Sequence, residues 1–149
     1  MLLVRHIMKK NVLVLTEDAT VKDTLDLMLE NYAGSVVIVD KETGRKPIGI
    51  VTERDILSKI VNLRKPLETP IKEIMSSPVI TISPDEPVEK AAELMTEKKI
   101  KKLPVVENGE LVGIITLTDI VASGVKLEEA VLRELARWFP IRKRQLMGG

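Results

Sequence analysis

Short runs of branched apolar residues alternate along the chain with segments of helical periodicity, and the alternation occurs twice. The pattern predicts β-strands at residues 12–15, 35–39 and 49–51, and again at 79–82, 103–106 and 113–115. Asn108-Gly109 between the last two runs is a strong signal for a two-residue β-hairpin. Each half of the chain therefore predicts strand, helix, strand, hairpin, strand and helix.

The helix of each half follows its first strand. Asp85-Glu86-Pro87 suits the start of the second of these helices, because acids are favoured in a first turn and proline needs no N–H partner there. Apolar residues then share one helical face, namely Val21, Leu25 and Met28 in the first half and Val88, Ala91, Ala92 and Met95 in the second. The closing helices are expected to begin at Thr52 and Thr116.

The two halves are copies of each other. A shift of 67 positions lays Ile7-Met8 on Ile74-Met75 and "SVVIVD" on "KLPVVE". Three extra residues in the first hairpin reduce the shift to 64, and "GIVTERDI" from Gly49 then matches "GIITLTDI" from Gly113. The duplication runs from residue 7 to residue 121. Two units of this size are expected to bury their apolar faces against each other.

Composition narrows the classes of function. The 149 residues include no cysteine, which excludes disulfides and Cys-based metal sites, and 23 basic against 22 acidic residues argue against a nucleic-acid coat. No apolar run approaches ~20 residues, so a cytoplasmic protein without a membrane span is expected. His6 is the only histidine, and no phosphate-binding glycine loop or hydrolase motif is present. We therefore expect no enzyme, no metal and no cofactor. Abundant Lys, Glu and Arg are typical of thermophiles.

The order of these motifs resembles a tandem pair of CBS domains, the module named after cystathionine β-synthase, also known as a Bateman module. The resemblance implies an α/β (α+β) fold in which two β-α-β-β-α repeats pack as a pseudo-twofold pair, followed by a C-terminal helix. It further implies a stand-alone protein that forms homodimers. The expected boundaries are 1–61 for the first repeat, 62–70 for the linker, 71–123 for the second repeat and 124–149 for the tail.

Threonine and aspartate occur three residues apart at the start of both closing helices. One interpretation is a capping box, in which the Thr hydroxyl accepts from a helical N–H and the acid reaches back. The other is nucleoside binding, because a carboxylate can accept hydrogen bonds from two neighbouring ribose hydroxyls. The resemblance favours the second interpretation and implies ribose contacts at Thr52 and Asp55 and at Thr116 and Asp119.

The resemblance also implies a slot for the base at each site, although core packing alone would explain the same apolar residues. The main site would contain Asn11, Val12, Leu13, Ala33, Gly34 and Ser35 in addition to Thr116 and Asp119. The second site would contain Pro78, Val79, Ile80 and Ile100 in addition to Thr52 and Asp55.

Phosphate recognition is expected to differ between the two sites. Lys101 and Lys102 align with positions that carry cations in nucleotide-binding CBS domains, so we assign them to the main site. The aligned residues of the first repeat, Gly34 and Ser35, carry no charge, which leaves Arg54 as the cation of the second site unless it points to solvent. The Asp119 site is therefore predicted to bind a nucleotide more tightly than the Asp55 site.

These features predict a regulatory module that binds an adenine nucleotide, AMP above all, and acts on an unknown partner protein. A sensor of S-adenosylmethionine or a related thioether nucleoside is one alternative. Others are an interaction module without a ligand and a regulator associated with nucleic acid through the basic residues 142–144. The apolar stripe Leu127, Val131, Leu135 and Trp138 predicts an amphipathic tail helix that either packs on its own module or forms a dimer contact.

Overall fold

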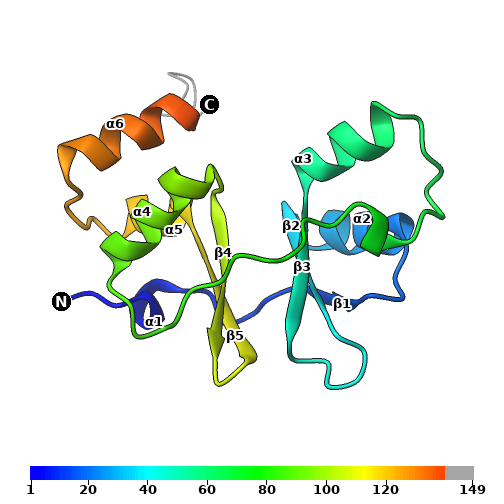
Figure 1. The fold of residues 1–149 in the computed structure, drawn as a ribbon, viewed down its shortest axis with the longest axis horizontal. Helices are drawn as coiled ribbons and strands as arrows, with labels where there is room; N and C mark the ends of the chain where they lie inside the picture. Colours follow the sequence, from blue (N-terminus) through cyan, green and yellow to red (C-terminus); the bar gives the residue numbers. More distant parts are fainter. Residues whose placement is uncertain (140–149) are drawn as a thin grey trace.

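The structure is a computed structural model and describes residues 1–139. The two repeats lie side by side, each with its own small sheet (Figure 1). In the first repeat, β1 runs parallel to β2, and β2 runs antiparallel to β3. Its elements are β1 (Val14–Thr16), α2 (Val21–Glu30), β2 (Ser35–Val39), β3 (Pro47–Thr52) and α3 (Glu53–Asp55), which continues as a π-helical segment over Ile56–Val61.

The second repeat has a two-stranded antiparallel sheet. Its elements are a 3-10 turn at Ile71–Glu73, α4 (Val88–Lys98), β4 (Lys102–Glu107), β5 (Glu110–Thr116) and α5 (Leu117–Ala122). Asn108 and Gly109 connect β4 to β5 with φ angles of 53° and 79°. Positive φ at both positions is what a type I′ hairpin requires, so the hairpin prediction is confirmed.

The strand predicted at 79–82 is wrong: the segment makes a single bridge to β4, between Ile82 and Val105. In the first repeat the Val37 N–H donates to the Leu13 carbonyl at 2.9 Å. The residue that corresponds to Val37 in the second repeat is Pro104, which has no N–H to donate to the Ile80 carbonyl. A ladder that begins at Ile80 therefore loses its first hydrogen bond.

The start of each repeat packs against the other repeat. The short helix α1 (Val4–Ile7) lies beside the second repeat, and the chain then crosses to form β1 (Figure 1). Val4 is fully buried in the second repeat's core, whereas Ile71 and Ile74 are buried in the core of the first. Bridges between Lys9 and Ile114 and between Ile50 and Ser76 repeat the same exchange. The repeats are thus interlocked as a pair.

A third, smaller cluster joins the two repeats. Val37 and Val39 of β2 are buried against Ile114 of β5, and Val12 and Ile50 pack at the edge of this cluster. Branched side chains from both sheets thus exclude water between the repeats, which provides the shared core expected of two units of this size. The predicted pair of packed α/β repeats is confirmed.

The glycine at position 113, in the middle of β5, has a steric cause. A Cβ atom on Gly113 would lie 2.7 Å from Met8 Sδ and 2.9 Å from the Lys9 carbonyl oxygen. The methionine end can move aside, but the Lys9 backbone is held by its hydrogen bonds to Ile114. Only glycine allows the crossing segment to lie this close to β5.

We therefore expect Gly113→Ala to lower the free energy of unfolding by about 1–3 kcal/mol, the usual cost of overpacking. Urea denaturation measures the change. Met8→Ala in the same chain removes the side-chain clash but not the backbone clash, so it should restore only part of the loss. A denaturation midpoint unchanged by Gly113→Ala would contradict this account of the crossing.

The tail helix α6 (Glu129–Trp138) packs on its own chain, against α4 (Figure 1). Leu135 is buried in the second repeat's core, and Leu127 and Val131 are partly buried against it. Trp138 stays 38% exposed and donates from Nε1 to Glu134. The intrachain interpretation of the stripe thus holds, and the basic residues 142–144 lie outside the described residues. No helix within 1–139 has the length and apolar character to cross a membrane.

Candidate functional site

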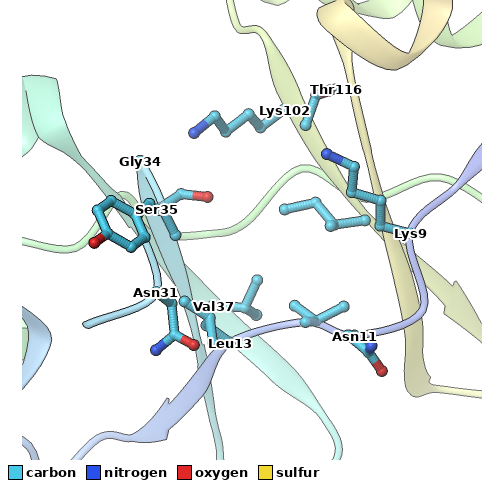
Figure 2. Close-up of a pocket in the computed structure, with 13 residues that line it drawn as sticks. Lys9, Asn11, Leu13, Asn31, Gly34, Ser35, Val37, Lys102 and Thr116 are labelled. Atoms are coloured by element: carbon cyan, nitrogen blue, oxygen red, sulfur yellow. The ribbon is translucent and has the colours of Figure 1, made fainter. Parts of the chain in front are cut away.

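A cavity of about 290 Å³ opens between the two repeats. Figure 2 shows its walls: the crossing segment that leads into β1, the start of β2 with the loop before it, and β5 from the other repeat. One side is apolar and the other carries amino groups. The lining residues are Lys9, Asn11, Val12, Leu13, Asn31, Tyr32, Ala33, Gly34, Ser35, Val37, Lys102, Ile114 and Thr116.

Two ammonium groups define the polar end of the cavity. The side chains of Lys9 and Lys102 both extend into it from the second repeat's side (Figure 2). Burial lowers the pKa of Lys102, the positive charges of Lys101 and Lys9 lower it further, and the carboxylate of Glu53 opposes these effects. A half-buried ammonium that is destabilised by like charges is a group that an anionic ligand would stabilise.

Asp119 is adjacent to this polar end. Its Oδ2 accepts from the backbone N–H and the hydroxyl of Thr116, both at 2.9 Å, and Thr116 Oγ1 accepts from the Asp119 N–H at 3.2 Å. The pair therefore forms a complete capping box at the start of α5. Only one carboxylate oxygen is used in this way. The other, Oδ1, has Lys9 Nζ at 3.7 Å, a long ion pair on a side chain that is 10% exposed.

Asp55 forms the same capping box with Thr52, but its second oxygen is occupied. Lys59 Nζ lies 3.1 Å from Asp55 Oδ1 and also donates to the Ile74 carbonyl at 2.8 Å. The Ser76 hydroxyl donates to the same Oδ1 at 3.4 Å. The residue that corresponds to Lys59 in the second repeat is Ser123, so Asp119 has no lysine four residues later and has only the longer contact with Lys9 among residues 1–139. Asp119 therefore has one carboxylate oxygen that a ligand can approach, whereas both oxygens of Asp55 are occupied.

The structure brings most of the predicted main site together. Asp119 lies just outside the lining, behind Thr116 and Lys9, and the ammonium of Lys101 lies elsewhere, 5.8 Å from the centre of the Phe139 ring. The predicted residues that line the cavity are Asn11, Val12, Leu13, Ala33, Gly34, Ser35, Lys102 and Thr116. Gly34 and Ser35 line the same cavity as Lys102, which agrees with their assignment to the main site and not with the comparison that placed them at the Asp55 site.

The residues of the predicted second site lie outside this cavity. Thr52 and Asp55 are paired, and Arg54 is exposed beside them. Ile80 and Ile100 pack against the second repeat's core, Val79 is half-buried and Pro78 is exposed. None of these residues lines the cavity described above.

Five lining residues were not found from the sequence: Lys9, Asn31, Tyr32, Val37 and Ile114. Lys9 reaches the cavity because the crossing segment pairs with β5, a long-range contact that the local pattern does not encode. Tyr32 could have been noticed in the sequence because it is the only tyrosine of the chain. In the structure its side chain is 99% exposed and its backbone φ is 51°. An exposed aromatic residue held at the rim of a cavity is suited to stack on a planar ligand.

The family model for the CBS domain matches residues 4–62 and 71–126. The chain therefore belongs to the CBS domain family, and it carries two copies of the domain in tandem. Among curated relatives, an uncharacterized protein of Methanopyrus kandleri is 37% identical over 91% of this chain and 69% of its own length. A CBS domain-containing protein of Bacillus subtilis is 28% identical over 85% of this chain and 89% of its own.

Other relatives are longer proteins. The chain spans 34% of an uncharacterized Methanocaldococcus jannaschii protein and 36% of one from Thermofilum pendens.

Solved structures share the fold over most of the chain. A CBS domain protein of Pyrobaculum aerophilum, complexed with AMP, is 33% identical, with a TM-score of 0.76 over 91% of this chain and 99% of its own. A CBS domain pair in complex with 5′-methylthioadenosine and S-adenosyl-L-methionine is 29% identical, with a TM-score of 0.73 over 82% of this chain and 94% of its own.

Proposed function

We propose that the cavity between the repeats binds an adenine nucleotide, AMP above all, and that the chain is a regulatory module rather than an enzyme. The observation that carries the proposal is the polar end of the cavity, where two ammonium groups and one partly available carboxylate lie next to an apolar wall. A ligand that combines an anion, a pair of hydroxyls and a flat apolar ring matches this arrangement. The CBS domain protein of Pyrobaculum aerophilum that is complexed with AMP supports the choice of ligand.

Each part of the nucleotide has a group to bind it. Val12, Leu13 and Ile114 provide an apolar wall for the base. Asp119 Oδ1 accepts from the ribose hydroxyls once Lys9 turns away from it, and the phosphate pairs with Lys102 and with the released Lys9. Because Asp55 is already neutralised by Lys59, we expect one tight site per chain.

Regulation follows from where the cavity lies. Its walls come from both repeats, so a bound nucleotide favours the relative arrangement of the repeats that fits it best. A partner protein that contacts both repeats would detect this shift. The proposal includes two further points: the chain acts on a partner protein, and it forms a homodimer.

S-Adenosylmethionine is the second candidate, because a related CBS domain pair is known in complex with it and with 5′-methylthioadenosine. Lys9 and Lys102 favour a phosphate over a sulfonium, since like charges at the same end of the cavity repel each other.

Thermal-shift assays with AMP, ADP, ATP, NADH and S-adenosylmethionine compare the candidates. Stabilisation by S-adenosylmethionine but not by AMP would reverse the ranking. No shift with any ligand would favour an interaction module, and salt-sensitive retention of DNA or RNA would favour the nucleic-acid alternative.

The affinities for AMP, ADP and ATP can be compared within the same assay, because these ligands differ only in the number of phosphate groups. AMP and ADP should bind at least as tightly as ATP, because Lys9 and Lys102 are the only cations among residues 1–139 that line the cavity. A magnesium-bound triphosphate would need additional carboxylates, and within residues 1–139 no cluster of three or more metal-ligating side chains is found. Much tighter binding of magnesium–ATP than of AMP would contradict the proposed phosphate site.

The lowered pKa of Lys102 predicts a pH dependence. A bound phosphate stabilises the ammonium and raises its pKa, so the affinity for AMP is full below the pKa of the free protein and falls as pH rises through it. We expect AMP affinity to fall by about tenfold or more across the alkaline range. This is the contribution of one charge-assisted hydrogen bond, here the bond between Lys102 and the phosphate. Calorimetry at a series of pH values measures it.

Two controls accompany this measurement. Adenosine has no phosphate, so its affinity should stay level over the same range. Lys102→Arg keeps its charge throughout and should remove the dependence for AMP. An equal dependence in the arginine variant would show that another group titrates.

A further inference from the structure

Glu53 places a carboxylate at the phosphate end of the cavity. It is the first residue of α3, and its N–H donates to the Gly34 carbonyl at 3.1 Å, which fixes its backbone beside the cavity wall. A Cβ atom added to Gly34 would lie 2.6 Å from Glu53 Oε1 and 2.8 Å from Lys102 Nζ. A carboxylate of the first repeat and an ammonium of the second therefore flank the same glycine.

The charge of Glu53 acts on the group that we assign to phosphate. Its field is the main influence that opposes the lowering of the Lys102 pKa by burial and by the neighbouring lysines. Within residues 1–139 no ion pair closer than 4 Å involves Glu53. The carboxylate is exposed and lies next to whatever binds at Lys102.

Four charges thus surround the polar end: Lys9 and Lys102 are positive, and Asp119 and Glu53 are negative. Asp119 is assigned to the ribose hydroxyls of the ligand, whereas Glu53 has no assigned contact with the ribose. One phosphate group can be compensated by the two ammoniums. Each additional phosphate brings negative charge toward Glu53, and among residues 1–139 no cation besides Lys9 and Lys102 lines the cavity. The residue that corresponds to Glu53 in the second repeat is Leu117, which carries no charge.

We propose that Glu53 is a specificity-determining residue that limits the cavity to ligands with few phosphate groups by repelling the additional charge of di- and triphosphates. The inference rests on the proposed nucleotide function and assigns the discrimination against longer phosphate chains to one side chain. Glu53 acts on the difference between ligands, and the affinity for adenosine is independent of it.

The test compares ligands of increasing charge on charge variants of residue 53. Calorimetry with adenosine, AMP, ADP and ATP, without magnesium and at low salt, is carried out on the native chain, on Glu53→Gln and on Glu53→Lys. The matched control is Glu93→Gln, which removes the same charge from an exposed position on α4 outside the cavity. Glu53→Gln should raise the affinity for ATP relative to AMP about fivefold, in line with a single exposed charge pair.

Glu53→Lys should raise this ratio further, ADP should lie between AMP and ATP, and adenosine should be unaffected. The gain should shrink in 0.5 M salt because exposed charges are screened (about 4 Å Debye length). An ATP-to-AMP ratio that is the same in the native chain and in both variants, or an equal change for adenosine, would overturn the proposal.

A second series separates this proposal from the proposed function. Inorganic phosphate, pyrophosphate and tripolyphosphate carry the same increase in charge without a nucleoside. If the native chain binds no adenine nucleotide, the proposed function fails. The role of Glu53 is then supported if Glu53→Gln raises the ratio of tripolyphosphate affinity to phosphate affinity above that of the native chain. It is contradicted if this ratio does not change. If nucleotides bind and neither series responds to residue 53, the function stands and the inference is wrong.

Discussion

Asp119→Ala should lower the affinity for AMP by roughly a hundredfold, whereas Asp55→Ala should leave it within about threefold of the native value. A hydrogen bond to a charged group is worth about 1.5–3 kcal/mol, and each 1.4 kcal/mol is tenfold in affinity. Among the described residues, Asp119 Oδ1 has only a 3.7 Å contact with Lys9, which leaves it available to ribose hydroxyls. Asp55 Oδ1 is taken by Lys59 at 3.1 Å and by Ser76.

The two variants are matched controls for each other. Both remove the acid of a capping box at the same Thr-x-x-Asp spacing, which should cost about 1 kcal/mol of fold stability, and Asp55→Ala should cost more because it also removes the Lys59 ion pair. Thermal melting checks that both are folded, and calorimetry measures AMP binding. A loss of tight binding in Asp55→Ala but not in Asp119→Ala would show that the two sites are ranked the wrong way round.

Removal of the tail after Ser123 should lower the melting temperature by about 10 °C or more. The cut removes α6, whose Leu135 is buried in the second repeat's core. Burial of one leucine side chain is worth about 1.5–3 kcal/mol, and the partly buried Leu127 and Val131 add to this value. For a chain of this size each 1 kcal/mol shifts the melting temperature by about 2–6 °C.

A cut after Phe139 keeps α6 and serves as the control against which the melting temperature of the shorter chain is compared. Leu135→Ala in the full chain should cost about 2–5 kcal/mol by itself. Unchanged melting of the chain cut after Ser123 would contradict the packing of α6 on α4. Light scattering on the same two chains tests the role of the tail in assembly, since only a subunit contact through α6 predicts a lower mass after the cut at Ser123.

Local features of the sequence predicted local features of the structure. Asn108-Gly109 specified its hairpin because both residues tolerate positive φ. The alignment of the two copies placed Thr116 and Asp119 at one helix start, where the capping interpretation proved correct. The capping box leaves one oxygen of Asp119 available, so the capping and binding interpretations are compatible.

Features that depend on contacts between the copies could not be predicted in the same way. Lys9 reaches the cavity only because the crossing segment lies on β5 of the other repeat. Lys101 and Lys102 are neighbours in sequence, but successive residues near a strand point to opposite sides, so only Lys102 lines the cavity. The ladder at residues 79–82 is missing because Pro104 has no N–H for the Ile80 carbonyl, and the pattern of strands alone does not show that these two groups would face each other.

A crystal structure of the chain with AMP tests the central claim most directly. The account predicts one nucleotide per chain in the cavity between the repeats. Its ribose should lie on Asp119 and its phosphate within hydrogen-bond distance of Lys102 and Lys9, with Lys9 turned away from the carboxylate. A nucleotide bound beside Asp55, or a phosphate that contacts neither Lys9 nor Lys102, would contradict it.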